Sequence, residues 1–165
     1  MASNGDALVG LWFDGQRHFP STLLANAVVD KLPVFELAIR WLDIYFSGNV
    51  PDFMPPIKMQ GTEFRMDVWK ILLEIPFGKT ISYGEIASRL ASERGVKAMS
   101  AQAVGGAVGH NPISLIVPCH RVVGSNGKLI GYGGGIQRKI ALLEMEGAWR
   151  QAPGLTICRP GNSIS

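Results

Sequence analysis

A cysteine followed directly by a histidine is the pair of residues in this chain best suited to covalent chemistry. The sequence Pro118-Cys119-His120-Arg121 follows an apolar run and precedes a glycine. A thiol reacts as its thiolate, which a neighbouring base makes accessible near neutral pH. Because adjacent side chains usually point apart, we expect His120 to act on Cys119 through a water molecule. A buried, inert cysteine is the alternative, but the flanking motif favours a nucleophile.

An imidazole that serves as a base usually needs a carboxylate to orient it. Glu146 or Glu144, at the end of the last predicted helix, is the candidate for this role. The two cysteines and three histidines of the chain show no C-x-x-C or H-x-x-x-H spacing, so we expect no metal site and no cofactor. Cys158 lies in a tail rich in proline, glycine and serine, and we interpret it as incidental.

Length and composition limit the classes of protein to which the chain can belong. It has 165 residues, of which 47% are hydrophobic and 18% charged, so we expect one domain or two small ones rather than a disordered chain. No uncharged run approaches the roughly 20 residues of a membrane span, and the N-terminus does not resemble a secretory signal. Two cysteines cannot support a disulfide scaffold. We therefore expect a cytoplasmic protein.

Charge is distributed unevenly along the chain, although the net charge is only +3. Residues 1–59 contain four basic and six acidic side chains, whereas residues 60–150 contain eleven basic and seven acidic ones. A basic C-terminal part is consistent with a polyanionic partner. Ordinary charge that keeps the protein in solution is the alternative.

Residues 48–56 contain three prolines and a glycine, and we interpret them as a linker. Before the linker, aromatic residues around Asp14-Gly15 predict a hairpin over residues 10–19. The apolar spacing from Pro33 to Phe46 predicts a helix. These elements predict a small N-terminal α+β unit.

The C-terminal part is predicted to be mostly helical. Thr62 is placed to cap one helix, Ser82 and Glu85 are spaced as a capping box for a second, and Ser100 can cap a third. Two short helices joined by a turn predict a helix-turn-helix. A last helix over residues 135–146 is predicted to turn three apolar residues inward: Ile136, Ile140 and Leu143.

The helix predicted over residues 101–108 carries almost only hydrogen or methyl side chains, and it includes Gly105 and Gly106. Tight packing against another helix is one explanation. Close approach of the backbone to a bulky ligand is the other. A helix about 10–12 Å wide can enter a DNA minor groove about 6 Å wide only if the groove opens and the side chains are small.

Seven motifs, in order, resemble those of the O6-alkylguanine-DNA alkyltransferases across residues 61–147. They are Gly61-Thr62-Glu63-Phe64, 81–87, 103–107, Asn111-Pro112, 116–124, 132–135 and 142–147. The resemblance implies an α+β protein with a ribonuclease-H-like N-terminal domain over residues 1–56. It implies a winged-helix-like C-terminal domain with a helix-turn-helix over residues 57–150, followed by a flexible tail over residues 151–165. The N-terminal half resembles the family only in size, position and order of elements.

The resemblance implies repair of O6-methylguanine, and of O4-methylthymine in some members, in double-stranded DNA. A damaged base is rotated out of the duplex into a pocket, because its alkyl carbon cannot be reached inside the stack. Cys119 would keep the alkyl group as a thioether, so each molecule acts once. His120, oriented by Glu146, would deprotonate the thiol, and Tyr83 would donate to the leaving guanine. Asn111 would tie the DNA-binding helix to the active-site segment.

The resemblance also implies which residues contact DNA and which line the pocket. The residues expected to contact DNA through the minor groove are Tyr83, Gln102, Ala103, Gly105, Gly106 and Arg121. The carbonyl groups of Cys119 and Val122 would read the guanine amine, and Tyr132, Gly133 and Gly134 would wall the pocket. We expect a monomer that needs no cofactor, binds no membrane and, in a prokaryote, is associated with the nucleoid.

Two positions depart from the pattern of the family. Gln102 stands where many members have an arginine that fills the gap left by the extruded base, and it lacks the positive charge of that residue. Gly133 stands where some members have a serine aimed at the guanine oxygen. A non-catalytic protein that recognises alkylated DNA is therefore an alternative, although such proteins lack the cysteine. A thiol redox or hydrolytic enzyme unrelated to DNA is a third reading, and it leaves the glycine-rich helix unexplained.

Overall fold

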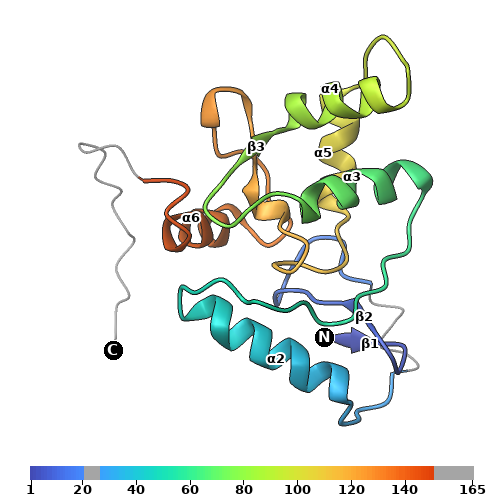
Figure 1. Ribbon diagram of the computed structural model, residues 1–165, viewed down its shortest axis with the longest axis vertical. Helices are drawn as coiled ribbons and strands as arrows, with labels where there is room; N and C mark the ends of the chain where they lie inside the picture. Colours follow the sequence, from blue (N-terminus) through green and yellow to red (C-terminus); the bar gives the residue numbers. More distant parts are fainter. Residues whose placement is uncertain (21–26, 151–165) are drawn as a thin grey trace.

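The computed structural model describes residues 1–20 and 27–150. Their elements, in chain order, are β1 (Ala2–Ser3), β2 (Leu8–Gly10), α2 (Pro33–Phe46), α3 (Glu63–Leu73), β3 (Ile81–Ser82), α4 (Tyr83–Glu93), α5 (Ala101–Gly109), η1 (Cys119–Arg121), β4 (Val122–Val123), η2 (Ser125–Gly127) and α6 (Ile136–Met145). The predicted mixture of helices and short strands is confirmed. Helices α3, α4 and α5 form one group, whereas α2 lies with β1 and β2 at the other end (Figure 1). The predicted tail over residues 151–165, with Cys158, lies outside the described residues.

The strand pair of the N-terminal part differs from the predicted hairpin. Strands β1 and β2 pair antiparallel around residues 4–7, not around Asp14-Gly15. A turn does occur at Asp14-Gly15, but the backbone before it pairs elsewhere. Leu11 N donates to Pro112 O at 2.9 Å, and Ser114 N donates to Leu11 O at 2.8 Å. The predicted hairpin was therefore wrong, because this backbone bonds to the C-terminal part instead.

Helix α2 has the predicted bounds and begins with Pro33, whose fixed φ angle suits the first helical position. Its buried face carries Ala38, Trp41 and Tyr45. The ring of Tyr45 stacks on that of Trp41, with centroids 5.2 Å apart and planes at 11°. This face directs a tyrosine hydroxyl toward the interior of the protein.

Each of the three predicted caps closes a helix start in the C-terminal part. Thr62 Oγ1 accepts from Arg65 N at 3.3 Å, and Ser100 Oγ accepts an N–H from the first turn of α5. At the start of α4, Glu85 N donates to Ser82 Oγ at 3.1 Å while Ser82 N donates to Glu85 Oε2 at 2.7 Å. The reciprocal pair is the predicted capping box, and it sets where α4 begins.

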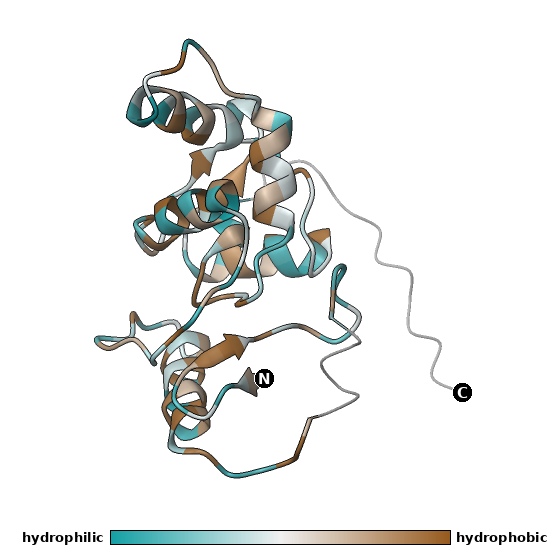
Figure 2. Ribbon diagram, turned by 90° about the vertical axis from the view of Figure 1, so that its right-hand side faces the viewer, coloured by the Kyte–Doolittle hydropathy of each residue, from teal (hydrophilic) through white to brown (hydrophobic). Residues whose placement is uncertain are grey.

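Helices α3, α4 and α5 pack on one another and carry both hydrophilic and hydrophobic residues along their length (Figure 2). Trp69 of α3 is buried, and its Nε1 donates to Ala107 O of α5 at 2.9 Å. Strands β3 and β4 form a parallel pair in which Ile81 lies opposite Val122. This pair joins the start of α4 to the segment that carries Cys119. Within residues 1–20 and 27–150, no helix has the length and apolar character needed to cross a membrane.

The inward face of α6 differs from the prediction. Leu143 is buried as expected, but Ile136 is 37% exposed. Lys139, which was not expected in the interior, is fully buried beside Leu142. A lysine can occupy this position because carbonyl oxygens surround its ammonium group, as described below.

We expect Ser82→Ala to lower the free energy of unfolding by about 1 kcal/mol, because the change removes the acceptor of an N-terminal helix cap. Ser88→Ala on the exposed face of the same helix is the matched control, expected to shift stability by less than about 0.5 kcal/mol. Urea denaturation monitored by circular dichroism measures both. Equal effects of the two substitutions would show that the cap contributes nothing.

Candidate active site

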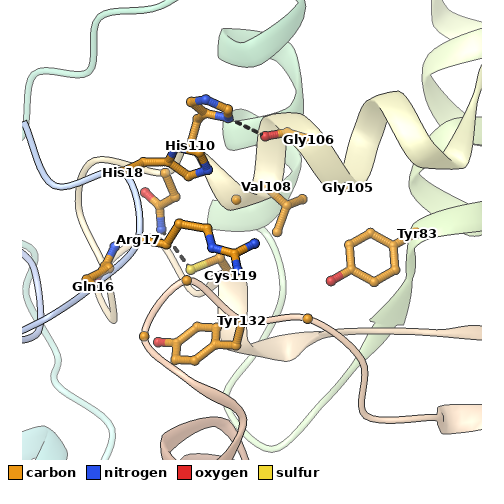
Figure 3. A pocket seen from close by; sticks show the side chains of 15 residues that line it. Gln16, Arg17, His18, Tyr83, Gly105, Gly106, Val108, His110, Cys119 and Tyr132 are labelled. Carbon is orange, nitrogen blue, oxygen red and sulfur yellow. Dashed lines mark hydrogen bonds between the residues drawn. The ribbon is translucent and has the colours of Figure 1, made fainter.

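The thiol of Cys119 lies at the wall of a cavity of about 260 Å³. Only 6% of the residue is exposed, yet its sulfur faces the open space (Figure 3). The residues that line the cavity come from the loop before α2, the start of α4, the second half of α5 with the two residues after it, the start of η1 and the loop before α6. They are Gln16, Arg17, His18, Tyr83, Gly105, Gly106, Val108, Gly109, His110, Asn111, Cys119, Gly131, Tyr132, Gly133 and Gly134. Small-molecule pockets usually measure about 300–1,000 Å³, and this cavity lies just below that range. Its volume therefore suits a single compact ring system better than a larger ligand.

Asn111 positions the segment that carries the thiol. Its Nδ2 donates to Val117 O at 2.7 Å and to Cys119 Sγ at 3.0 Å. Its Oδ1 accepts from Ile113 N at 3.0 Å. The side chain therefore links the end of α5 to both ends of the buried run 113–119, as the sequence led us to expect. Leu115 within this run has φ = 72°, a strained value for a non-glycine residue.

Burial raises the pKa of the Cys119 thiol above its usual range. The hydrogen bond from Asn111 and the charge of Lys139 oppose this effect without cancelling it. The resting thiol is therefore protonated at neutral pH. A base must remove its proton during any reaction in which the sulfur attacks an electrophile.

The predicted base, His120, is fully buried behind the cysteine. Its Nε2 lies 2.7 Å from Glu146 Oε1, so Glu146 rather than the exposed Glu144 is the carboxylate that orients the ring. Burial lowers the pKa of His120 below its usual value, and the hydrogen bond and charge of Glu146 work against that shift. The imidazole is therefore neutral in the resting protein and can accept a proton.

Tyr45 is a member of this cluster that the sequence did not reveal. Its hydroxyl donates to Glu146 Oε1 at 2.6 Å and lies 3.2 Å from His120 Nε2. The sequence pattern treats Tyr45 as one apolar position of an amphipathic helix, and its spacing carries no signal of a polar role. The first fifty residues therefore contribute a polar group behind the thiol, where the sequence suggested no such cluster.

Arg121 does not lie where a DNA contact requires it. It is 8% exposed, and its Nε and Nη2 donate to Glu146 at 2.9 and 3.0 Å. Its Nη1 donates to Ile75 O at 2.7 Å. The prediction that Arg121 binds DNA is therefore wrong. Its guanidinium is buried and neutralises the carboxylate of Glu146, and its nitrogens donate within the protein.

The carboxylate of Glu146 receives a further hydrogen bond from Gly78 N at 3.2 Å. Gly78 has φ = 73°, and a Cβ there would meet Glu146 O at 2.9 Å, so this close approach requires glycine. Burial alone would raise the pKa of Glu146, but its bonds to His120, Arg121 and Tyr45 outweigh burial and lower it to about 2. The carboxylate of Glu146 is therefore ionised at neutral pH.

Lys139 is a second buried charge that the sequence did not reveal. Its Nζ donates to the carbonyl oxygens of Val122, Ile130 and Gly131 at 2.5, 3.0 and 3.1 Å. Burial lowers its pKa to about 8, whereas the nearby Cys119 raises it. The sequence did contain one indication of its burial. Lys139 precedes Leu142 and Leu143 by three and four residues, a spacing that places it on the same, buried face of α6.

Val122 is fully buried and is not one of the cavity residues. Its carbonyl oxygen accepts a hydrogen bond from Lys139 Nζ. Tyr83 and Tyr132 lie on two sides of the cavity, and Figure 3 shows both near Cys119. Burial raises the pKa of each phenol, and the proximity of Cys119 raises it further. Both are therefore proton donors at neutral pH.

The small-residue face of α5 borders the cavity. Gly105 and Gly106 line it, and Gln102 and Ala103 are exposed on the same helix. A Cβ at Gly106 would meet nothing within 4 Å, and one at Gly105 would meet only Tyr83 at 3.8 Å. Packing within the protein therefore does not require these glycines. Their position favours the second explanation, in which a ligand approaches the backbone.

A loop of the N-terminal part completes the rim of the cavity, which the sequence did not indicate. Arg17 N donates to Gly133 O at 2.9 Å and so holds this loop against the loop before α6. The ring of His18 stacks on that of His110, with centroids 4.1 Å apart. His110 Nδ1 in turn lies 2.7 Å from Gly106 O, as Figure 3 shows. In the described part of the chain, no group of three acidic, histidine or cysteine side chains is arranged to hold a metal.

The chain is similar in sequence to a known family of DNA-modifying proteins. Residues 63–148 match the family model described as "6-O-methylguanine DNA methyltransferase, DNA binding domain". The methylated-DNA–protein-cysteine methyltransferases of Mycobacterium bovis and Mycobacterium leprae are 53% and 44% identical to the chain. Each alignment covers 88% of this chain and 84% of the relative.

Two solved structures share most of the fold. A crystal structure of Mycobacterium tuberculosis OGT in complex with DNA has a TM-score of 0.76 at 46% identity, covering 88% of this chain and 84% of that one. An O6-methylguanine DNA methyltransferase from Methanococcus jannaschii has a TM-score of 0.61 at 29% identity, covering 96% and 93%. The resemblance seen in the motifs is thereby confirmed: the chain belongs to the methylated-DNA–protein-cysteine methyltransferase family.

Proposed function

We propose that this protein repairs O6-methylguanine in DNA by transferring the methyl group irreversibly to Cys119. The observation that carries the proposal is a buried thiol that faces a cavity the size of one nucleobase, with an imidazole–carboxylate pair behind it. The family to which the chain belongs, and the names of its relatives, support the same activity. O4-methylthymine is a second substrate of the same chemistry.

The reaction is a displacement at the methyl carbon. As the bond between Cys119 Sγ and carbon forms, the bond between carbon and O6 breaks, and its electron pair stays on the guanine. His120 accepts the thiol proton, and the carboxylate of Glu146 stabilises the resulting imidazolium. Tyr83 donates a proton to the leaving base and is reprotonated, so the thiol proton finally resides on guanine. The thioether is not hydrolysed, and each molecule therefore acts once.

The DNA is proposed to meet α5 through its minor groove. Ala103, Gly105 and Gly106 offer the helix backbone without bulky side chains, and Gln102 enters the space left by the extruded base. The minor groove distinguishes mainly A·T from G·C pairs, which suits a protein that must act in any sequence. The rotated base then occupies the cavity between Tyr132, Gly133 and Gly134 on one side and α5 on the other.

Two finer points of the chemistry and fold belong to the same proposal. The carbonyl oxygens of Cys119 and Val122 read the guanine amine. Residues 1–56 form a ribonuclease-H-like domain and residues 57–150 a winged-helix-like domain, in which α4 and α5 serve as the helix-turn-helix. The protein acts as a monomer and uses no cofactor, because thiol, base and proton donor all belong to one chain.

We expect Cys119→Ser to abolish methyl transfer while it leaves folding and binding to methylated DNA intact, because the change removes the nucleophile and little volume. Intact-mass spectrometry after incubation with an oligonucleotide that contains O6-methylguanine measures the transfer. Cys158→Ser is the matched control and is expected to gain one methyl group, as the unaltered chain does. A chain that binds this DNA tightly but never gains a methyl group would be a damage-recognition protein instead.

We expect Gln102→Arg to tighten binding to DNA, because arginine adds a positive charge and a planar donor fork at the exposed start of α5. The gain should be near 1 kcal/mol, at the lower end of the about 1–3 kcal/mol of a bidentate base contact. The slope of log Kd against log salt should steepen by about 1. Gln137→Arg, exposed on α6, adds the same charge elsewhere. Fluorescence anisotropy that gave equal gains for both variants would place Gln102 outside the interface.

A further inference from the structure

The hydroxyl of Tyr45 contacts both the proposed base, His120, and the carboxylate of Glu146 that orients it. It lies 2.6 Å from Glu146 Oε1 and 3.2 Å from His120 Nε2. Burial, followed by the bond to Glu146, raises the pKa of Tyr45 far above its ordinary value, so the phenol keeps its proton. Because the carboxylate can only accept, that single proton points to Glu146, and the lone pairs of the hydroxyl oxygen are left for His120.

This arrangement determines which nitrogen of His120 carries the proton. Both groups within reach of Nε2, the Glu146 oxygen and the Tyr45 oxygen, are acceptors, so Nε2 must be the N–H donor. The lone pair is then on Nδ1, which is buried and has no hydrogen-bond partner among the described residues. Nδ1 is thus the nitrogen that can receive the thiol proton, and since it has no direct hydrogen bond to Cys119 Sγ, the transfer runs through a water molecule.

We propose that Tyr45 is a positioning residue of the methyl-transfer reaction, which holds His120 as the Nε2–H tautomer and moderates the pull of Glu146 on the imidazole. This role rests on the proposed function. It gives the N-terminal part an indirect role in the chemistry of the C-terminal part. Tyr45 touches neither the cavity nor the sulfur and acts only through Glu146 and His120.

The position of the hydroxyl is held by packing on several sides. Tyr45 is fully buried on α2, its ring is stacked on Trp41, and Phe77 meets it edge-on with centroids 6.0 Å apart. The ring of His120 meets it edge-on at 6.3 Å. These ring contacts, together with the two polar contacts of the hydroxyl, hold Tyr45 beside Glu146 and His120.

The effect of the hydroxyl on proton transfer has a definite sign. The groups around His120 that carry or change charge come from α2, η1, the loop before α6 and α6 itself: Tyr45, Cys119, Arg121, Tyr132, Lys139 and Glu146. Without the Tyr45 hydroxyl, His120 Nε2–H loses a distant acceptor at 3.2 Å, which lowers the pKa of His120. The larger effect is that Glu146 Oε1 loses its closest donor, at 2.6 Å, and binds the His120 N–H more strongly. The pKa of His120 then rises, and the imidazole loses its capacity as a base at a higher pH.

Tyr45→Phe tests this role, since it removes one oxygen atom and keeps the ring. The rate of single-turnover methyl transfer is measured from about pH 5 to about pH 9, across the range in which histidine titrates. We expect the midpoint of the acid limb to move up by about half a pH unit, a threefold loss of neutral imidazole on the acid side. The ¹⁵N NMR signals of His120, recorded without DNA, should show the Nε2–H tautomer and the same upward shift.

Trp41→Phe is the matched control, because it loosens the packing around the same ring without touching a polar group of the cluster. It should lower the melting temperature and leave the midpoint unchanged. A midpoint that stays in place or moves down in Tyr45→Phe would overturn the proposal, whatever happens to the overall rate. An unaltered chain that transfers no methyl group would instead overturn the proposed function, and the NMR titration would still decide the role of Tyr45.

Discussion

The buried carboxylate of Glu146 is the constraint on which the rest of the site depends. Five donor groups converge on its two oxygens, from Tyr45, Gly78, His120 and twice from Arg121. An ionised carboxylate without partners would be prohibitively costly in this interior, so these donors must all be in place together. The donors come from α2, the turn after α3 and η1, and Glu146 itself follows the last turn of α6. The folding of four separate segments is therefore coupled through one negative charge.

This coupling explains why the reactive segment can be rigid although it is irregular. Cys119, His120 and Arg121 form a single 3₁₀ turn in which successive side chains point to different surroundings. Arg121 and His120 are held by Glu146, and Cys119 is held by Asn111. Each side chain of the turn thus has its own anchor. The strained backbone at Leu115 persists because the bonds on either side of it leave no relaxed alternative.

The sequence predicted what depends on local chemistry and missed what depends on distant contacts. The bounds of α2 and the capping box at Ser82 follow from spacing within a few residues, whereas the link made by Asn111 was expected from the family resemblance. The hairpin around Asp14-Gly15 was wrong because the backbone of Leu11 bonds to Pro112, about a hundred residues away. Arg121 was wrongly assigned to DNA because its guanidinium binds Glu146, 25 residues away. The polar role of Tyr45 was invisible for the same reason, since its partner Glu146 lies 101 residues along the chain.

A thiol that is protonated at rest suits a protein whose cysteine is permanently alkylated after a single reaction. Oxidants attack the thiolate much faster than the thiol, so a cysteine ionised at rest would be lost to sulfenic acid before it met damaged DNA. Burial keeps Cys119 neutral, and the neutral imidazole of His120 behind it leaves the proton on sulfur until an electrophile enters the cavity. As a consequence, the thiol proton must leave during the reaction itself. The tautomer of His120 determines that Nδ1 is the nitrogen that accepts it. Accurate placement of His120 by Glu146 and Tyr45 thus substitutes for a lowered thiol pKa.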